Sequence, residues 1–127
     1  MSERSPVRSE QAPAPIGPYS QAVTHAGVLY CSGSLPLNAE TDELENSSIG
    51  AETRRSLANL ASVCEAAGTS LGRGLMLMIY TTELESFAEI NEAYASFFDA
   101  DPPARATVGV AALPMGARVE IAAQVAI

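Results

Sequence analysis

Two stretches of the chain repeat apolar residues at the spacing of an amphipathic helix. The first covers residues 52–67, and Gly68 supplies a stop signal after it. Its apolar stripe consists of Leu57, Leu60, Ala61 and Cys64. The second begins at Ser86, where Glu89 completes a capping box, and ends before the Asp-Pro-Pro sequence at 101–103. The pattern therefore predicts two helices, each with one buried face.

Other segments have the apolar patterns of β-strands. These strands are predicted at residues 21–24, 28–32, 75–82, 106–111 and 118–126. Ala26 and Gly27 separate the first two strands, which favours a hairpin. The run at 75–82 has no polar break before its threonines and is typical of a strand buried on both faces.

This order of elements predicts an α+β fold, a β-sheet covered on one face by two helices. In the last strand, apolar residues alternate with a more polar set that includes Glu120, so the sheet has an apolar and a more polar side. Two helices cover only one face, so the other face meets solvent or another subunit. Residues 1–15 show no periodicity and are expected to form a flexible N-terminal tail before a single domain over residues 16–127.

The amino-acid composition indicates which side chains form the core. Of the 127 residues, 47% are hydrophobic and 17% charged, which indicates a folded chain. Aromatic residues make up only 6% and Trp is absent, so the core must be built largely from small side chains. We therefore expect further burial between subunits.

The charge balance disfavours several partners. Fifteen acidic and seven basic residues give a net charge of -8, which opposes binding to nucleic acid or to an anionic membrane surface. The N-terminal residues lack the apolar region of a secretory signal, which points to the cytoplasm. Cys31 and Cys64 fall at apolar positions expected for buried thiols, and with one histidine they provide no set of zinc ligands.

Two common functional motifs are missing from the sequence. It contains neither a phosphate-binding loop nor the G-x-S-x-G pattern of serine hydrolases. His25 lies beside the predicted hairpin turn, where an exposed structural role is the simpler interpretation than that of a catalytic base.

Arg105 and Glu120 are the candidates for chemistry. Arg105 follows Pro102-Pro103-Ala104 and precedes a strand, a setting that fixes where its guanidinium points. A rigid guanidinium is a good bidentate receptor for a small carboxylate, although an ordinary surface ion pair is the alternative. Glu120 lies in the middle of a strand, where pairing with Arg118 or across the sheet is its alternative role.

Five segments resemble, in order, the RidA/YjgF family of small enamine/imine deaminases. They are APAPIGPYSQA, SGSLPLN, FAEINEAYASFF, PPARATVGVAALP and RVEIAAQVA, and the similarity extends from about Glu10 to Ile127. The resemblance implies a chorismate-mutase-like protomer that assembles as a homotrimer, with sites in the clefts between subunits. It also implies a reaction that needs no cofactor and no metal.

The resemblance assigns roles to particular residues. It implies that Arg105 binds the substrate carboxylate and that Glu120 positions or activates the attacking water. Tyr19 would close over the ligand, Asn91 would belong to the site, and Gly33 would let the backbone approach the ligand closely.

Some positions depart from the family pattern. Thr107, two residues after Arg105, is within the family's range and belongs to the implied substrate site, whereas Ser34 stands where deaminases commonly have Gln. Gly109 and Ala112 also differ from the usual polar residues. These changes leave the carboxylate-binding arginine in place and alter its surroundings.

The implied activity is hydrolysis of short-lived 2-enamine or 2-imine acids, such as 2-aminoacrylate, to 2-oxo acids and ammonia. An imine carbon is already electrophilic, so holding the carboxylate, placing a water and moving a proton suffice. The alternatives are a pathway-specific protein for a larger imine or enamine and a non-catalytic trimer that binds small carboxylates. Ribonuclease activity is disfavoured by the net charge.

Overall fold

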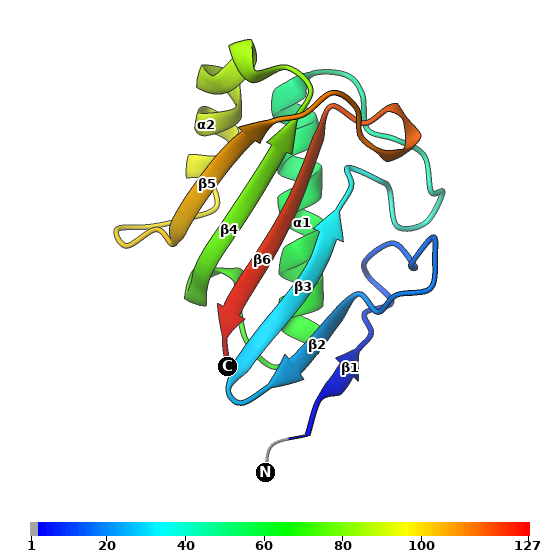
Figure 1. Cartoon of the computed structure of the whole chain (residues 1–127), viewed down its shortest axis with the longest axis vertical. Helices are drawn as coiled ribbons and strands as arrows, with labels where there is room; N and C mark the ends of the chain where they lie inside the picture. Colours follow the sequence, from blue (N-terminus) through cyan, green and yellow to red (C-terminus); the bar gives the residue numbers. More distant parts are fainter. Residues whose placement is uncertain (1–2) are drawn as a thin grey trace.

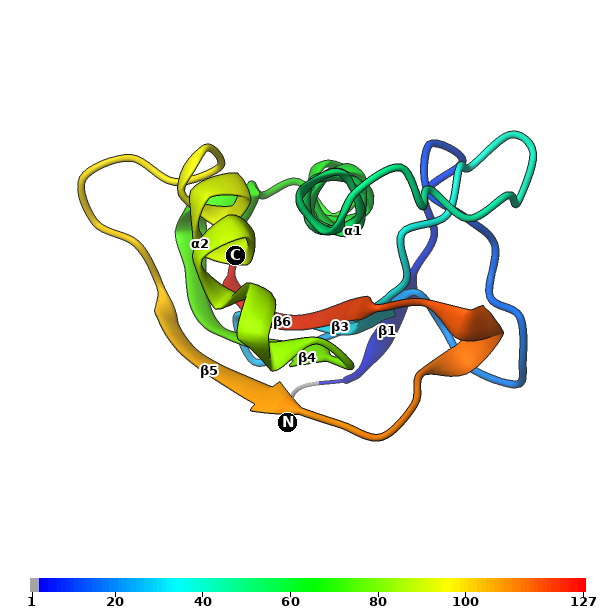
Figure 2. The same ribbon diagram turned by 90° about the horizontal axis from the view of Figure 1, so that it is seen from above.

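The structure, a computed structural model that describes residues 3–127, is a β-sheet with two helices on one side (Figures 1 and 2). The strands are β1 (Ser5–Val7), β2 (Ala22–His25), β3 (Val28–Ser34), β4 (Gly74–Thr81), β5 (Ala104–Gly109) and β6 (Val119–Ala126). The α-helices are α1 (Ile49–Ala66) and α2 (Phe87–Ala95), and short 3-10 helices are η1 (Leu71–Arg73), η2 (Leu84–Ser86) and η3 (Pro114–Gly116). No helix within residues 3–127 combines the length and apolar character needed to cross a membrane.

The six strands form one mixed sheet in the order β1-β2-β3-β6-β4-β5. Neighbouring strands are antiparallel except β4 and β5, which run parallel because α2 carries the chain back between them. β5 is therefore an edge strand, and β6 lies inside the sheet. Both helices lie on the same side of the sheet (Figure 2), which confirms the predicted α+β arrangement.

The core lies between the helices and the sheet. In the apolar stripe of α1, Leu57 and Cys64 have no exposed surface. The same core contains alternate residues of the neighbouring strands β4 and β6: Leu77, Ile79, Ile121, Ala123 and Val125. Burying an aliphatic side chain of this size contributes about 1.5–3 kcal/mol. This packing fixes the register of β4 and β6, so alternate positions along each strand face opposite sides of the sheet.

The opposite face of the sheet carries no helix (Figure 2). Glu120 and Gln124 of β6 lie on this face, as the alternation predicts. Their neighbours are mostly apolar, namely Tyr30, Met78, Tyr80, Ala106 and Val108. Tyr30 is 45% exposed and Val108 40% exposed. The uncovered face is thus more apolar than the last strand alone indicates, and it is suited to contact with another subunit.

The helix starts depend on contacts that the sequence pattern does not show. α1 begins at Ile49, before the predicted residue 52, because the side chain of Ser48 accepts the backbone N–H of Ala51 at 3.0 Å. The predicted capping box at Ser86 is wrong, since this serine makes no capping hydrogen bond. Its expected partner, Glu89, instead accepts the backbone N–H of Gly50 at 2.9 Å and so ties α2 to the start of α1.

The N-terminal segment differs from the expected flexible tail, because β1 pairs with β2. Ser9 and Ala12 are buried. The side-chain amide of Gln21 holds this segment, since its Oε1 accepts the N–H of Ser9 at 2.6 Å and its Nε2 donates to the Pro13 carbonyl at 2.8 Å. This buried amide thus supplies hydrogen-bond partners for the backbone of a segment whose sequence has no periodic pattern.

Candidate active site

Arg105 lies on the edge strand β5, beside Leu77 of β4, and therefore faces the helices. Its Nη1 donates to the Oδ1 of Asn91 on α2 at 2.8 Å. The guanidinium carbon lies 4.8 Å from the ring centre of Tyr94 and 5.6 Å from that of Phe87. One hydrogen bond and two cation–π contacts therefore fix the direction of the guanidinium.

The positive charge of Arg105 is not neutralised within the described residues. Both ion pairs found within residues 3–127 involve Arg118. This finding contradicts the surface ion pair that was the alternative role for Arg105. A half-buried guanidinium with free N–H donors and a fixed orientation has the chemistry to bind a carboxylate.

Thr107 lies two positions after Arg105 on the same face of β5. Its Oγ1 is buried without a hydrogen-bond partner in the described part of the chain, and so is the hydroxyl of Tyr94. Burial raises the pKa of Tyr94, while the charge of Arg105 opposes that shift, and the phenol stays protonated at neutral pH. Two buried hydroxyls without a partner thus belong to residues that neighbour Arg105 in the fold.

A second cluster surrounds Glu120 on the uncovered face. Glu120, Gly33 and Tyr19 line a cleft of about 330 Å³. A Cβ atom on Gly33 would lie 2.8 Å from the carboxyl carbon of Glu120, so a side chain at this position would require the Glu120 carboxyl to shift. The hydroxyl of Tyr19 accepts the backbone N–H of Ile16 at 3.2 Å, which places the phenol ring at the cleft wall.

The carboxyl of Glu120 has a shifted pKa and no ion-pair partner among residues 3–127. Burial in the cleft raises the pKa of its carboxyl, because removing water disfavours the charged form. A carboxylate with a raised pKa is a stronger base than an exposed one and can accept a proton from water.

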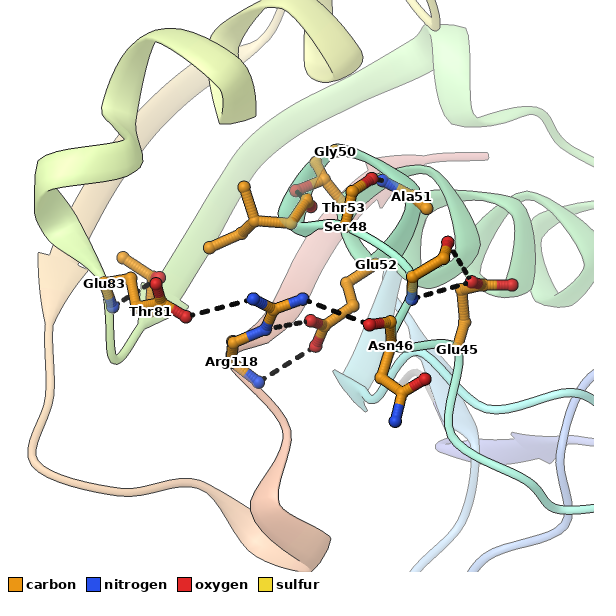
Figure 3. Close-up of polar contacts among 12 residues, drawn as sticks. Glu45, Asn46, Ser48, Gly50, Ala51, Glu52, Thr53, Thr81, Glu83 and Arg118 are labelled. Atoms are coloured by element: carbon orange, nitrogen blue, oxygen red, sulfur yellow. Dashed lines mark hydrogen bonds and ion pairs between the residues drawn. The ribbon is translucent and has the colours of Figure 1, made fainter.

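Arg118 pairs with Glu52 and Glu83 (Figure 3), which contradicts its pairing with Glu120, the alternative role of that glutamate. The backbone N–H of Arg118 donates to the Oε1 of Glu52 at 3.0 Å, and its Nε donates to the Oε2 of the same residue. Its Nη1 lies 3.3 Å from the Oε2 of Glu83. Glu52 is fully buried in α1, so Arg118 compensates this carboxylate and leaves Glu120 free.

We expect the substitution Arg118→Met to destabilise the fold by about 3 kcal/mol, because it leaves the buried carboxylate of Glu52 without its positive partner. Urea unfolding at pH 7 measures the change. Arg73→Met is the matched control, since Arg73 is exposed and forms no ion pair within residues 3–127. The double variant Glu52→Gln/Arg118→Met should recover much of the loss. Equal losses in the single and double variants would contradict the assignment.

The two clusters lie on opposite faces of the sheet within this chain. Arg105 is in register with Leu77 and Ala123, which face the helices, whereas Glu120 is in register with Tyr80 on the uncovered face. The structure therefore brings together Arg105, Asn91 and Thr107, and separately Tyr19, Gly33 and Glu120. It does not place the two groups where one small molecule could contact both.

Sequence reasoning missed Phe87 and Tyr94 as supports of Arg105. Both lie on the face of α2 that carries Asn91, and this helical spacing is the signal that could have identified them. His25 is exposed, as its place beside the turn predicts. Within residues 3–127, no group of three or more His, Cys, Asp or Glu residues is placed to hold a metal ion.

Known proteins resemble the chain over nearly its whole length. The family model for endoribonuclease L-PSP matches residues 9–127. A RutC family protein from Sulfurisphaera tokodaii is 40% identical, over 91% of this chain and 93% of that protein. The 2-iminobutanoate/2-iminopropanoate deaminase of Dermatophagoides farinae is 39% identical, over 95% of this chain and 94% of that protein.

A solved structure shares the whole fold. The Rid family protein YyfA from Yersinia pestis superimposes with a TM-score of 0.95 at 38% identity, covering 98% of this chain and 100% of that one. Together with the sequence matches, this agreement shows that the chain belongs to the endoribonuclease L-PSP family, also known as the RidA/YjgF family.

Proposed function

We propose that the protein is a hydrolytic deaminase that converts short-lived 2-enamine or 2-imine acids, such as 2-aminoacrylate, to 2-oxo acids and ammonia. The observation that carries the proposal is the uncompensated guanidinium of Arg105, held by Asn91 and two aromatic rings. The deaminase relative at 39% identity acts on substrates of this class, according to its name.

A homotrimer would complete the site. Arg105 and Glu120 lie on opposite faces of one sheet, so one small substrate can contact both only if they come from different protomers. The apolar uncovered face offers the surface for such an assembly. We therefore propose that Arg105 of one protomer faces the Glu120 cleft of its neighbour, with Tyr19 and Gly33 on the Glu120 side.

The reaction then needs only groups present in the two clusters. Arg105 and the hydroxyl of Thr107 hold the substrate carboxylate, and this places the C=N carbon in the cleft of the neighbouring protomer. Glu120 takes a proton from a water whose oxygen adds to that carbon and passes this proton to the imine nitrogen, which gives a carbinolamine. Glu120 then takes the hydroxyl proton and transfers it to the nitrogen while the C=O bond forms and the C–N bond breaks, so that a 2-oxo acid and ammonia leave.

The test is a pyridoxal-phosphate dehydratase reaction in which semicarbazide competes for the released imine. The wild-type protein should accelerate formation of free 2-oxo acid in proportion to its concentration. A rate identical to that without protein would refute the proposal.

RNA cleavage is not part of the proposal despite the family's descriptive name. Polyanions bind through several Lys and Arg contacts, and this chain has seven basic against fifteen acidic residues. RNA hydrolysis that survives purification to homogeneity would argue otherwise.

The shared site makes a further prediction for mixed trimers. Arg105→Ala and Glu120→Gln protomers, each inactive alone, should regain about one quarter of wild-type activity when refolded together in equal amounts. Each site takes its arginine from one protomer and its glutamate from the neighbouring one. Each of these two protomers is of either chain type with equal probability, so about one site in four contains both residues. A mixture no more active than its components would show that the two residues do not share a site.

A further inference from the structure

A recess of about 50 Å³ lies beside the cleft that contains Glu120. The recess and the cleft share the wall residues Ile16, Tyr19, Ser32, Gly33 and Leu35. The recess extends from this common wall to the N-terminal segment and to α1, which contributes Leu60 and Val63. The recess and the cleft are therefore adjacent, and Tyr19 and Gly33 belong to the wall of both.

The polar side chains around the recess are already used in hydrogen bonds. Asn59 donates to two main-chain carbonyls at 3.2 and 2.9 Å, and Ser34 donates to a carbonyl of α1 at 2.8 Å. Ser32 donates to the Ser20 carbonyl at 2.6 Å, and the amide of Gln21 holds the N-terminal segment. Among residues 3–127, none of those that line the recess is charged. A polar substituent would find few free partners there, whereas an apolar one loses only its contact with water.

We infer that the recess is a subsite for the apolar side chain of the substrate, and that the protein prefers 2-imino acids with an aliphatic side chain of about four carbons over 2-aminoacrylate. The inference rests on the proposed function, which places the substrate's C=N carbon beside Glu120. Each methylene group that moves from water into the recess should tighten binding about fourfold. Three additional carbons should therefore tighten it by well over tenfold.

Ser34 and Val63 limit the recess from two sides. Val63 is 5% exposed on α1, and Ser34 is half-buried at the end of β3. A larger side chain at either position would occupy part of the recess. The two positions offer independent ways to close it without changing Arg105 or Glu120.

Binding of stable 2-oxo acids tests the subsite separately from turnover. Calorimetry on the intact wild-type protein should show that 4-methyl-2-oxopentanoate binds at least tenfold more tightly than pyruvate. Val63→Phe should reduce that ratio by at least tenfold. If this variant does not fold, Ser34→Gln should reduce the ratio in the same direction. Ala66→Leu, on the exposed side of the same helix, is the matched control and should keep the wild-type ratio.

Hydrolysis of two imines distinguishes the two proposals. An amino-acid oxidase produces one imine from leucine and the other from alanine. If neither imine is hydrolysed faster with the protein, but the affinity ratio is high and falls in Val63→Phe, the recess stands and the proposed function fails. If both imines are hydrolysed but the affinity ratio is near one, or is unchanged by filling the recess, the subsite is refuted and the proposed function stands.

Discussion

Replacing Arg105 by alanine should lower kcat/KM for 2-oxo acid release by about 10²–10³-fold, because the substrate loses the charged group that orients its carboxylate. Arg118, the next arginine along the chain, is engaged by Glu52 and Glu83 and is therefore not free to replace it. The trapped dehydratase reaction measures the effect, with substrate concentration varied so that KM and kcat are separated.

Arg105→Lys distinguishes orientation from charge alone. Lysine keeps the positive charge but has neither the planar donors for a bidentate carboxylate nor the flat surface that lies over Tyr94. We expect it to recover less than a tenth of the lost activity. Arg73→Ala, at an exposed position, should behave as wild type. Retention of more than a fifth of the activity in Arg105→Ala would contradict the assigned role.

The local elements of the fold were predictable because they depend on periodicity. The stripe of α1 and the alternation of β6 follow directly from side-chain burial, and the hairpin follows from Ala26 and Gly27, both of which have positive φ. β1 was missed because its order comes from pairing with β2 and from the amide of Gln21. Such long-range hydrogen bonds leave no periodic pattern in the segment that they stabilise.

The site was only partly predictable for the same reason. The chemistry and local setting of Arg105 made it a candidate carboxylate receptor, but its supports on α2 become neighbours only after the β4-α2-β5 crossover forms. The contact between Arg118 and Glu52 spans 66 positions. From the sequence alone, Arg118 therefore remained a candidate ion-pair partner of Glu120. The two clusters face opposite sides of the sheet. This placement follows from the pairing register of the strands, which the sequence does not specify.

Glu120→Gln should lower the rate of imine hydrolysis by about 10²–10⁴-fold, because an amide has the shape of the carboxyl but cannot accept a proton from water. The wild-type rate should fall as the pH decreases through the raised pKa of Glu120, at a higher pH than for an exposed glutamate. The residual activity of the variant should lack this acidic limb. Rates measured from pH 4 to 8 in the trapped assay test both expectations.

The same substitution should increase stability, in the direction opposite to its effect on activity. The folded-state pKa of Glu120 is raised, so its contribution to stability is greatest below its unfolded-state pKa and is lost as the pH rises through the folded-state value. At pH 7 the wild type carries an ionised, partly buried carboxylate, and the neutral glutamine avoids that cost. The Tm advantage of the variant should therefore shrink as the pH is lowered and vanish below the ordinary glutamate pKa.

Opposite changes in activity and stability separate a catalytic glutamate from a structural one. A residue needed only for packing beside Gly33 would lower both when it is replaced. A variant that is less stable than the wild type at pH 7, or that retains full activity, would refute the role assigned to Glu120. A more stable and nearly inactive variant is expected if the cleft maintains a buried base at the expense of stability.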